Sequence, residues 1–310
     1  MSTEALAPPI VSQVRPRYLG IAVERAIPLV TVSLVVLALW YLGAVWMNAD
    51  LQRDAFANAG RTDHSATDFV FGTWSQERPR LPAPHQILAE LDKSLLRTPL
   101  TSKRSLAFHA AVTIEATLLG FGLGALLGLG LSVLVTHSRS LDRGMMPWIV
   151  ASQTVPVVAL APMIVVILNQ FDVTGIVPKA VIAAYLSFFP VTVGMVKGLR
   201  SPDPLQRDLM RTYSASRTQT LAKLRLPASL PFLFASLKIG VAASLVGTIV
   251  AEVTKSEDGG LGARLLAGSY YGQTVQIWAA LVVAAVCAAV LVALIGFSER
   301  MAIRAQGGRV

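Results

Sequence analysis

The residues of this sequence most able to do chemistry are ionisable side chains that lie within long apolar runs. Glu115, Lys238 and Glu252 are of this kind, and each lies toward one end of its run. A charged side chain is costly in hydrocarbon, so it either lines a route for a solute or is paired with another group. We expect Glu115 and Lys238 to be structural, reaching an interface or pairing with a loop. For Glu252 both roles stay open.

Two uncharged polar residues and a proline join Glu252 as candidates for a solute pathway. Gln153 and Asn169 lie in one apolar run, and Pro156 lies between them. Side-chain amides can donate and accept hydrogen bonds. Proline kinks a membrane helix and frees a backbone carbonyl. The candidate pathway residues are therefore Gln153, Pro156, Asn169 and Glu252.

The other reactive residue types are isolated from one another. His109 and His137 lie at run edges without further metal ligands nearby, so we expect surface roles for both. Cys287 is the single cysteine, which rules out a disulfide within the chain. No Gly-x-x-x-x-Gly-Lys-Ser/Thr phosphate loop is present. We therefore predict no catalytic residue, no metal site and no cofactor in this chain, which we expect not to be an enzyme.

The composition predicts an all-α polytopic membrane protein. Hydrophobic residues make up 54% of the 310 residues, charged residues only 15%, and the mean hydropathy is +0.58. The apolar residues form blocks of about twenty, which as helices span about 30 Å of hydrocarbon. No gap between the blocks has the composition of a second globular domain. We expect about six transmembrane helices, at residues 28–47, 112–135, 147–169, 176–197, 232–252 and 277–297.

The first block is expected to be a retained membrane helix. Arg15, Arg17 and Arg25 precede it, as in a signal peptide, but the run 28–47 is too long for a signal-peptide core. Prolines interrupt two later blocks: Pro156 and Pro162 the third, and Pro190 the fourth.

The basic residues predict which side each loop faces. Lys and Arg collect in cytoplasmic loops, and they are dense in the segment 200–231 but sparse in the loops after the third and fifth blocks. Both termini are therefore expected in the cytoplasm. The formal net charge of +9 is explained by this orientation better than by nucleic-acid binding.

Two further segments have recognisable patterns. In the first outside loop, residues 48–80 are polar and expected to be irregular, and Leu81-Pro82-Ala83-Pro84 precedes a short amphipathic helix. In the second block, Gly120, Gly124 and Gly128 recur every four residues, which allows a neighbouring helix to approach closely.

The most informative segment is 200–231, RSPDPLQRDLMRTYSASRTQTLAKLRLPASLP. It is amphipathic at helical spacing and has prolines at both ends, which predicts two short helices with a turn near Ser214–Ser216. A loop of this length is more than a simple connection between helices. We expect it to be bound by another protein.

This segment resembles the EAA loop of bacterial ABC importer permeases, whose pattern is acidic-Ala-Ala, three residues, Gly, nine residues, then Ile-x-Leu-Pro. Counting back from Leu226-Pro227 places Leu224 at the Ile, Ser214 at the Gly and Asp208 at the acidic position. Leu209 and Met210 replace the alanines. Serine for glycine weakens the prediction of a left-handed turn.

The resemblance extends over about 81–297 and is strongest to the nitrate/sulfonate/taurine-type branch. It rests also on Val155-Pro156 through Ala161-Pro162 and on Val250-Ala251-Glu252. The domain organisation it implies is a cytoplasmic segment 1–27, a first helix with a periplasmic insert 28–80, a core domain 81–297 and a tail 298–310. The implied fold is that of ABC type I importer permeases.

What the resemblance implies about function is a permease for a small solute. Such permeases work as a pair with two cytoplasmic ATPase subunits, which hold the ATP and Mg²⁺, and with a periplasmic or lipid-anchored binding protein in the inner membrane. The substrate would be a small anion, such as nitrate, a sulfonate or taurine, or a pyrimidine-type vitamin precursor. The residues implied to couple the loop to the ATPase are Asp208, Arg211, Thr212, Tyr213, Ser214, Ala215, Ser216, Leu224, Leu226 and Pro227.

Two other classes of protein compete with this hypothesis. An ion-coupled secondary transporter would need coupling carboxylates or interrupted helices near the membrane centre, and no acid lies in the middle of any run. A membrane enzyme would need a cluster of His, Asp, Glu or Cys at one membrane face, and none is found.

Overall fold

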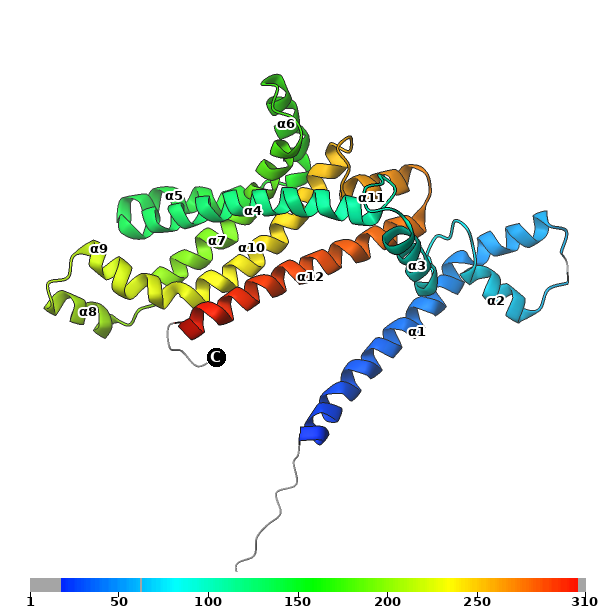
Figure 1. Ribbon diagram of the computed structural model, residues 1–310, viewed down its shortest axis with the longest axis horizontal. Coiled ribbons are helices and arrows are strands. Elements are labelled where there is room, and N and C mark those ends of the chain that lie inside the picture. Colours follow the sequence, from blue (N-terminus) through cyan, green and yellow to red (C-terminus); the bar gives the residue numbers. More distant parts are fainter. Residues whose placement is uncertain (1–17, 62, 306–310) are drawn as a thin grey trace, which may run out of the picture. The chain divides into compact units, whose positions relative to one another are not determined.

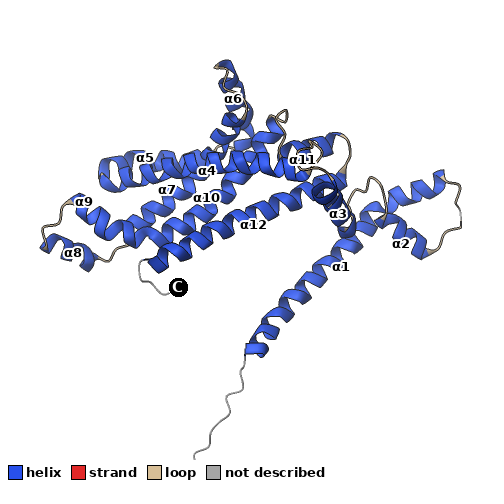
Figure 2. Ribbon diagram, in the orientation of Figure 1, coloured by secondary structure: helices blue, strands red, loops and turns tan. Residues whose placement is uncertain are grey.

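The computed structural model describes residues 18–61 and 63–305, and within these ranges every regular element is a helix (Figure 2). Five of the helices are long and apolar enough to cross a membrane, and one bent helix pair is a sixth candidate. The prediction of an all-α protein with about six spans is confirmed. The chain divides into two compact units, residues 1–84 and 85–310.

Unit 1 contains α1 (Tyr18–Asn58) and α2 (Ala66–Trp74). The expectation that 48–80 is irregular is wrong, because α1 continues past the apolar run and α2 forms after a short connection. The sequence from Asn48 to Asn58 has no glycine or proline to end a helix. The helix ends just before Gly60, whose φ is 63°. Arg15 and Arg17 lie outside the described residues.

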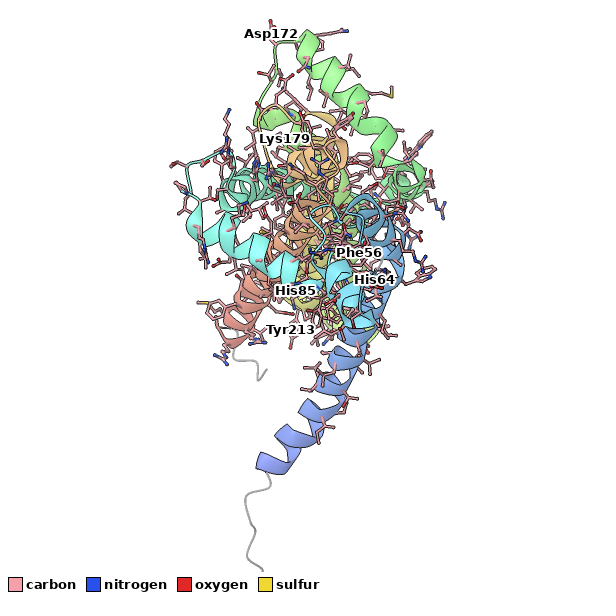
Figure 3. The ribbon with its side chains drawn as sticks, turned by 90° about the vertical axis from the view of Figure 1, so that its right-hand side faces the viewer. Phe56, His64, His85, Asp172, Lys179 and Tyr213 are labelled. Carbon is pink, nitrogen blue, oxygen red and sulfur yellow. The ribbon has the colours of Figure 1, made fainter. Side chains whose placement is uncertain are left out.

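Asn48 organises unit 1. Its side chain is fully buried, and its Nδ2 donates to the carbonyls of Thr73 and Leu81 at 3.1 and 2.8 Å. Its Oδ1 accepts from the backbone N–H of Arg80 at 2.8 Å. Nearby, Phe56 and His64 stack with ring centroids 4.5 Å apart (Figure 3). A buried amide whose polar atoms are hydrogen-bonded in this way holds α1 in one position against the segments that carry Thr73 and residues 80–81.

Unit 2 is a bundle built on three helices, α4 (Leu106–His137), α7 (Ile176–Leu199) and α10 (Leu226–Thr254). The fourth long helix, α12 (Thr274–Ala305), packs along α10 (Figure 1). The short helix α3 (Pro84–Leu91) continues as a π-helical turn over Asp92–Arg97, which confirms the expected short amphipathic helix.

The glycines of α4 are the places where α7 comes closest. A Cβ at Gly124 would lie 2.0 Å from Ser187 Oγ and 2.7 Å from the carbonyl oxygen of Ala184, so no larger residue fits without movement. Gly120 and Gly128 are in equally tight contact with α7. The stripe predicted from the sequence therefore packs against a helix of the same chain.

The third predicted span is not one helix. It is divided into α5 (Arg139–Ala151) with a 3₁₀ turn at Ser152–Thr154, and α6 (Val157–Gln170), which bends away by 100°. The break occurs at Pro156, which has no N–H to donate and holds Val155 in an extended conformation. In Figure 1, α6 points away from the bundle. Pro162 and Pro190, by contrast, lie inside continuous helices.

The connections place two groups of residues at opposite ends of unit 2. The short helices α8 (Pro204–Thr212) and α9 (Arg217–Thr220) join α7 to α10 at one end. At the other end, α11 (Leu261–Tyr270) joins α10 to α12 (Figure 1).

Lys238 of α10 is paired with Glu299 of α12 at 2.5 Å, in line with the structural role expected for it.

Candidate functional sites at the two ends of unit 2

The loop between α7 and α10 folds as two capped helices, as the sequence predicts. Asp203 caps α8 by accepting the N–H of Leu205 at 2.8 Å, and Pro204 follows at the first helical position. Ser216 caps α9, accepting the N–H of Gln219 at 3.2 Å. Between them, Ser214 has a φ of 52°. The left-handed conformation, which serine disfavours, is therefore present at this position. The caps of α8 and α9 hold the backbone on both sides of it.

One face of α8 carries an exposed apolar ridge formed by Leu205, Leu209 and Tyr213. These side chains recur every four residues and are 78%, 55% and 76% exposed. Large apolar side chains gathered on a capped, polar-flanked helix are typical of a surface that another molecule covers. Figure 3 labels Tyr213 on this loop.

Asp208 lies in the second turn of α8, where it pairs with Arg211 at 3.0 Å. The acid at the positive end of the helix dipole is Asp203, the N-cap residue. The helix begins there because Asp203-Pro204 is a strong start signal.

The loop joins the bundle through a continuous helical stretch. A π-helical turn, Leu221–Arg225, follows α9 and leads directly into α10 at Leu226 and Pro227. Leu224 is half-buried within that turn. On the other side, Arg200 at the end of α7 pairs with Asp142 of α5 at 2.8 Å. The loop is thus continuous with α10 through helical residues, whereas residues 200–203 between α7 and α8 are not helical.

At the opposite end, Glu252 is fully buried among hydrogen-bond donors. Thr113 Oγ1 lies 2.9 Å from both carboxylate oxygens, and the N–H of Gly262 donates to Oε2 at 2.9 Å. Thr113 in turn accepts the N–H of Leu261 at 2.8 Å. One carboxylate thus connects α10 to α4 and to the start of α11. Gly260, with φ 119°, has no space for a Cβ, which would lie 2.1 Å from Glu252 Cδ.

His109 and Lys179 complete this network, which we call the Glu252 network. His109 Nδ1 accepts the N–H of Gly260 at 2.9 Å, and its Nε2 lies 2.9 Å from the carbonyl of Lys103. Lys179 of α7 is 1% exposed and donates to the carbonyl of Gly259 at 3.1 Å. Its Nζ lies 4.0 Å from Asp258 (Figure 3 labels Lys179). The surface role expected for His109 is wrong, whereas His137 is exposed.

Comparison with known proteins decides the family. The family model described as "Binding-protein-dependent transport system inner membrane component" matches residues 120–305, more than half of the chain. This chain belongs to that family. It is a multi-pass membrane permease of an ABC importer, and such a permease works with an ATPase and a binding protein.

Individual relatives agree with the family assignment. A probable ABC transporter permease protein of Haemophilus influenzae is 34% identical over 56% of this chain and 69% of its own length. The formylaminopyrimidine transport permease protein ThiX of Halalkalibacterium halodurans is 32% identical over 58% of this chain and 67% of its own. The putative aliphatic sulfonates transport permease protein SsuC of Bacillus subtilis is 27% identical over 66% and 71%.

Solved structures show the same fold at lower identity. An amino acid ABC transporter with histidines has a TM-score of 0.54 and 17% identity, covering 63% of this permease and 93% of that chain. The inward-facing MetNI methionine ABC transporter has a TM-score of 0.52 and 22% identity, covering 64% and 95%. The fold of unit 2 is thus that of ABC importer permeases.

The structure does not bring the four candidate pathway residues of the permease together. Gln153 and Pro156 lie exposed at the break between α5 and α6, and Asn169 lies exposed near the far end of α6. Glu252 is enclosed in the Glu252 network and borders no open space. Glu115 is exposed on α4.

Sequence reasoning missed several residues of the permease that the Glu252 network uses. Lys179, near the start of the predicted span 176–197, was counted only among the few basic charges on the outer side. Thr113 and Thr117 of α4 were not singled out. Thr117 Oγ1 donates to Thr248 at 3.1 Å, and Ser244 Oγ donates to the carbonyl of Thr117 at 3.0 Å. Ser244 and Thr248 lie on the face of α10 that ends at Glu252, which the sequence did indicate. The signal was a hydroxyl every four residues on both helices, which is also the spacing of close packing.

Proposed function

We propose that the α8–α9 loop is the surface by which this permease couples to its ATPase. The observation that carries the proposal is the exposed ridge of Leu205, Leu209 and Tyr213 on a helix with fixed ends. A capped helix with an apolar ridge suits insertion into a groove of another protein. The coupling residues named from the motif are Asp208, Arg211, Thr212, Tyr213, Ser214, Ala215, Ser216, Leu224, Leu226 and Pro227.

The permease acts as a homodimer in the inner membrane with both termini and the coupling loop in the cytoplasm. The concentration of Lys and Arg in 200–231 supports this orientation. Residues 1–27 and 298–310 are the cytoplasmic ends, and residues 48–80 extend on the periplasmic side, where the binding protein docks. ATP and Mg²⁺ are held by the ATPase subunits, and this chain carries no cofactor of its own.

The transported solute is a small anion or a pyrimidine-type vitamin precursor. Support comes from relatives named for formylaminopyrimidine, aliphatic sulfonates and nitrate. Uptake of labelled nitrate, taurine and formylaminopyrimidine by cells that express the complete transporter separates the two classes. Uptake of none of them contradicts the substrate proposal and leaves the coupling proposal untouched.

The coupling proposal is tested by placing a charge on the ridge. Leu209→Glu should prevent the ridge from entering an apolar groove, because a buried unpaired carboxylate is strongly unfavourable. We expect the ATPase to be lost when the tagged permease is purified from membranes, and ATP-driven uptake to be lost with it. The control is Tyr271→Glu, which places the same charge on another exposed large side chain at the opposite end of unit 2.

The control should keep the ATPase bound. If Leu209→Glu also retains the ATPase and transports at the normal rate, the ridge is not the coupling surface. Orientation is tested separately with an impermeant thiol reagent on intact cells carrying single cysteines in a Cys287→Ala background. Labelling at position 214 but not at position 60 would reverse the proposed topology.

A further inference from the structure

A second surface of the coupling loop faces the end of α4, away from the apolar ridge. Between the end of α4 and the α8–α9 loop lies an open cavity of about 570 Å³. Its polar lining consists mainly of Thr136 and His137 from α4, Arg207 and Arg211 from α8, and Arg217 and Arg225 from the start and end of the following helical stretch. We call it the basic cavity.

The basic cavity has a large excess of positive charge. Four guanidinium groups line it, and the one lining carboxylate, Asp208, is already paired with Arg211 at 3.0 Å. Among the residues that the structure describes, Arg207, Arg217 and Arg225 have no acidic partner within 4.0 Å. Like charges gathered around one space repel one another unless a counter-anion occupies it. The charge balance therefore indicates an anion.

Two donors on the cavity wall lack partners. Arg225 Nε and Thr136 Oγ1 are buried and without a hydrogen bond within the described part of the chain, where only one other buried side-chain atom, Arg264 Nε, is in that state. An unsatisfied buried donor is unfavourable. Both residues line the basic cavity, one from each side of it. The wall of the cavity therefore contains donors that no acceptor in the described part of the chain satisfies.

The cavity is distinct from the apolar ridge. Pro204, Arg207, Asp208 and Arg211 line it and share one face of α8, whereas the ridge residues lie about 150° around the helix. An ATPase that covers the ridge therefore leaves the arginine face directed at the end of α4.

We infer that the basic cavity binds a phosphate group, presented either by an anionic phospholipid headgroup or by a soluble phosphate. Guanidinium forks match phosphate oxygens in charge and geometry. The cavity lies where α4 ends, and the apolar side chains of Val133 and Leu221 form part of its wall. A bound phosphate would bridge α4 and the α8–α9 loop. This site lies beyond the proposed transport function and does not depend on the solute. Because Asp208, Arg211 and Ala215 belong both to its lining and to the proposed coupling residues, it rests on the ATPase covering the ridge and leaving the cavity open.

The test compares two charge-removing variants of the full-length permease. Arg217→Gln/Arg225→Gln removes two lining guanidiniums and keeps side-chain length. Lys223→Gln is the matched control, because Lys223 is in the same helical turn but does not line the cavity. Loss of two charge-assisted contacts should weaken phosphate binding by about tenfold or more. The phosphate affinity of the control variant should stay within about twofold of that of the unchanged protein. Thermal unfolding of each variant checks that it is folded.

Two arms identify the source of the phosphate. In the first, inorganic phosphate is titrated by calorimetry into delipidated permease in an uncharged detergent. In the second, the permease is reconstituted in nanodiscs with or without phosphatidylglycerol. It is then released from the nanodiscs inside the mass spectrometer, and the lipid that stays bound is measured by native mass spectrometry. Binding in the first arm identifies a soluble phosphate site, and binding only in the second identifies a headgroup site.

Three results would overturn the inference: no binding in either arm, equal weakening by Lys223→Gln and the double variant, or loss of binding when the ATPase is bound to the permease. The last result would mean that the arginines meet the ATPase itself.

Discussion

The two ends of unit 2 both carry several polar groups but differ in how far these groups are buried and hydrogen-bonded. Around Glu252, a carboxylate, a histidine, a lysine and a threonine are buried and hydrogen-bonded to one another or to backbone from α4, α7, α10 and α11. At the α8–α9 loop, arginines and an apolar ridge remain exposed or unpaired. The Glu252 network finds its hydrogen-bond partners within the chain, whereas we propose that the α8–α9 loop finds its partners on other molecules. Substitutions at the first should therefore lower the stability of the isolated permease, whereas those at the second should affect what it binds.

The largest effect is expected within the bundle that holds the two ends apart. Gly124→Leu would force atoms into Ser187 and the backbone of Ala184, and should destabilise the permease by about 3 kcal/mol or more. Thermal unfolding in detergent measures this loss of stability. Gly130→Leu on the same helix is the control, since nothing lies within 4 Å of a Cβ there. Equal stability of the two variants would mean that the α4–α7 contact is looser than described.

The Glu252 network should give the next largest effect. Glu252→Ala removes the acceptor of the Gly262 N–H and leaves the Thr113 hydroxyl without its acid, which should cost about 2–3 kcal/mol. Glu115→Ala, an exposed acid on α4, should change stability by less than about 0.5 kcal/mol. If the two variants unfolded at the same temperature, Glu252 would not be the structural centre of this end.

A smaller effect is expected at the turn of the coupling loop. Ser214→Val places a β-branched residue at φ 52° and should cost about 1–2 kcal/mol locally, whereas Ser214→Gly should stabilise the turn by up to about 1 kcal/mol. The rate of amide hydrogen exchange in the α8–α9 backbone measures the stability of the turn in each variant. Equal protection in the two variants would show that the turn relaxes without cost.

The smallest effect on the isolated permease is expected at the ridge. Leu209→Glu should change its unfolding free energy by less than about 0.5 kcal/mol, because the side chain is already exposed. The same variant should lose the ATPase. A large fall in stability without the ATPase present would show that the ridge packs against the chain itself, and the contrast between the two ends would fail.

The sequence was most informative where structure is local. The helix pair in 200–231 was predicted from prolines and apolar spacing, and the α4 stripe from glycines four residues apart, because both signals lie within a few residues of one another. The break at Pro156 was expected as a kink, since proline alone does not determine the bend angle.

The Glu252 network escaped prediction because its partners are far apart in the chain. Thr113 and Glu252 are 139 residues apart, and Lys179 meets Gly259 across 80 residues. No local pattern distinguishes a lysine that faces water at the end of a helix from one that is buried against a distant carbonyl. The same limit applies to His109, which was expected on the surface. The role of the candidate pathway residues stays a prediction.

The bend between α5 and α6 has a consequence for how the chain is made. Thirteen and fourteen helical residues rise about 20 Å each, so neither piece alone crosses about 30 Å of hydrocarbon. The backbone at the break needs partners that lipid cannot supply, and one of them is the Tyr185 hydroxyl, which donates to the carbonyl of Ser152. Tyr185 is on α7, which the ribosome produces later. During synthesis, this segment must therefore wait for the next helix before it can reach its final position in the membrane.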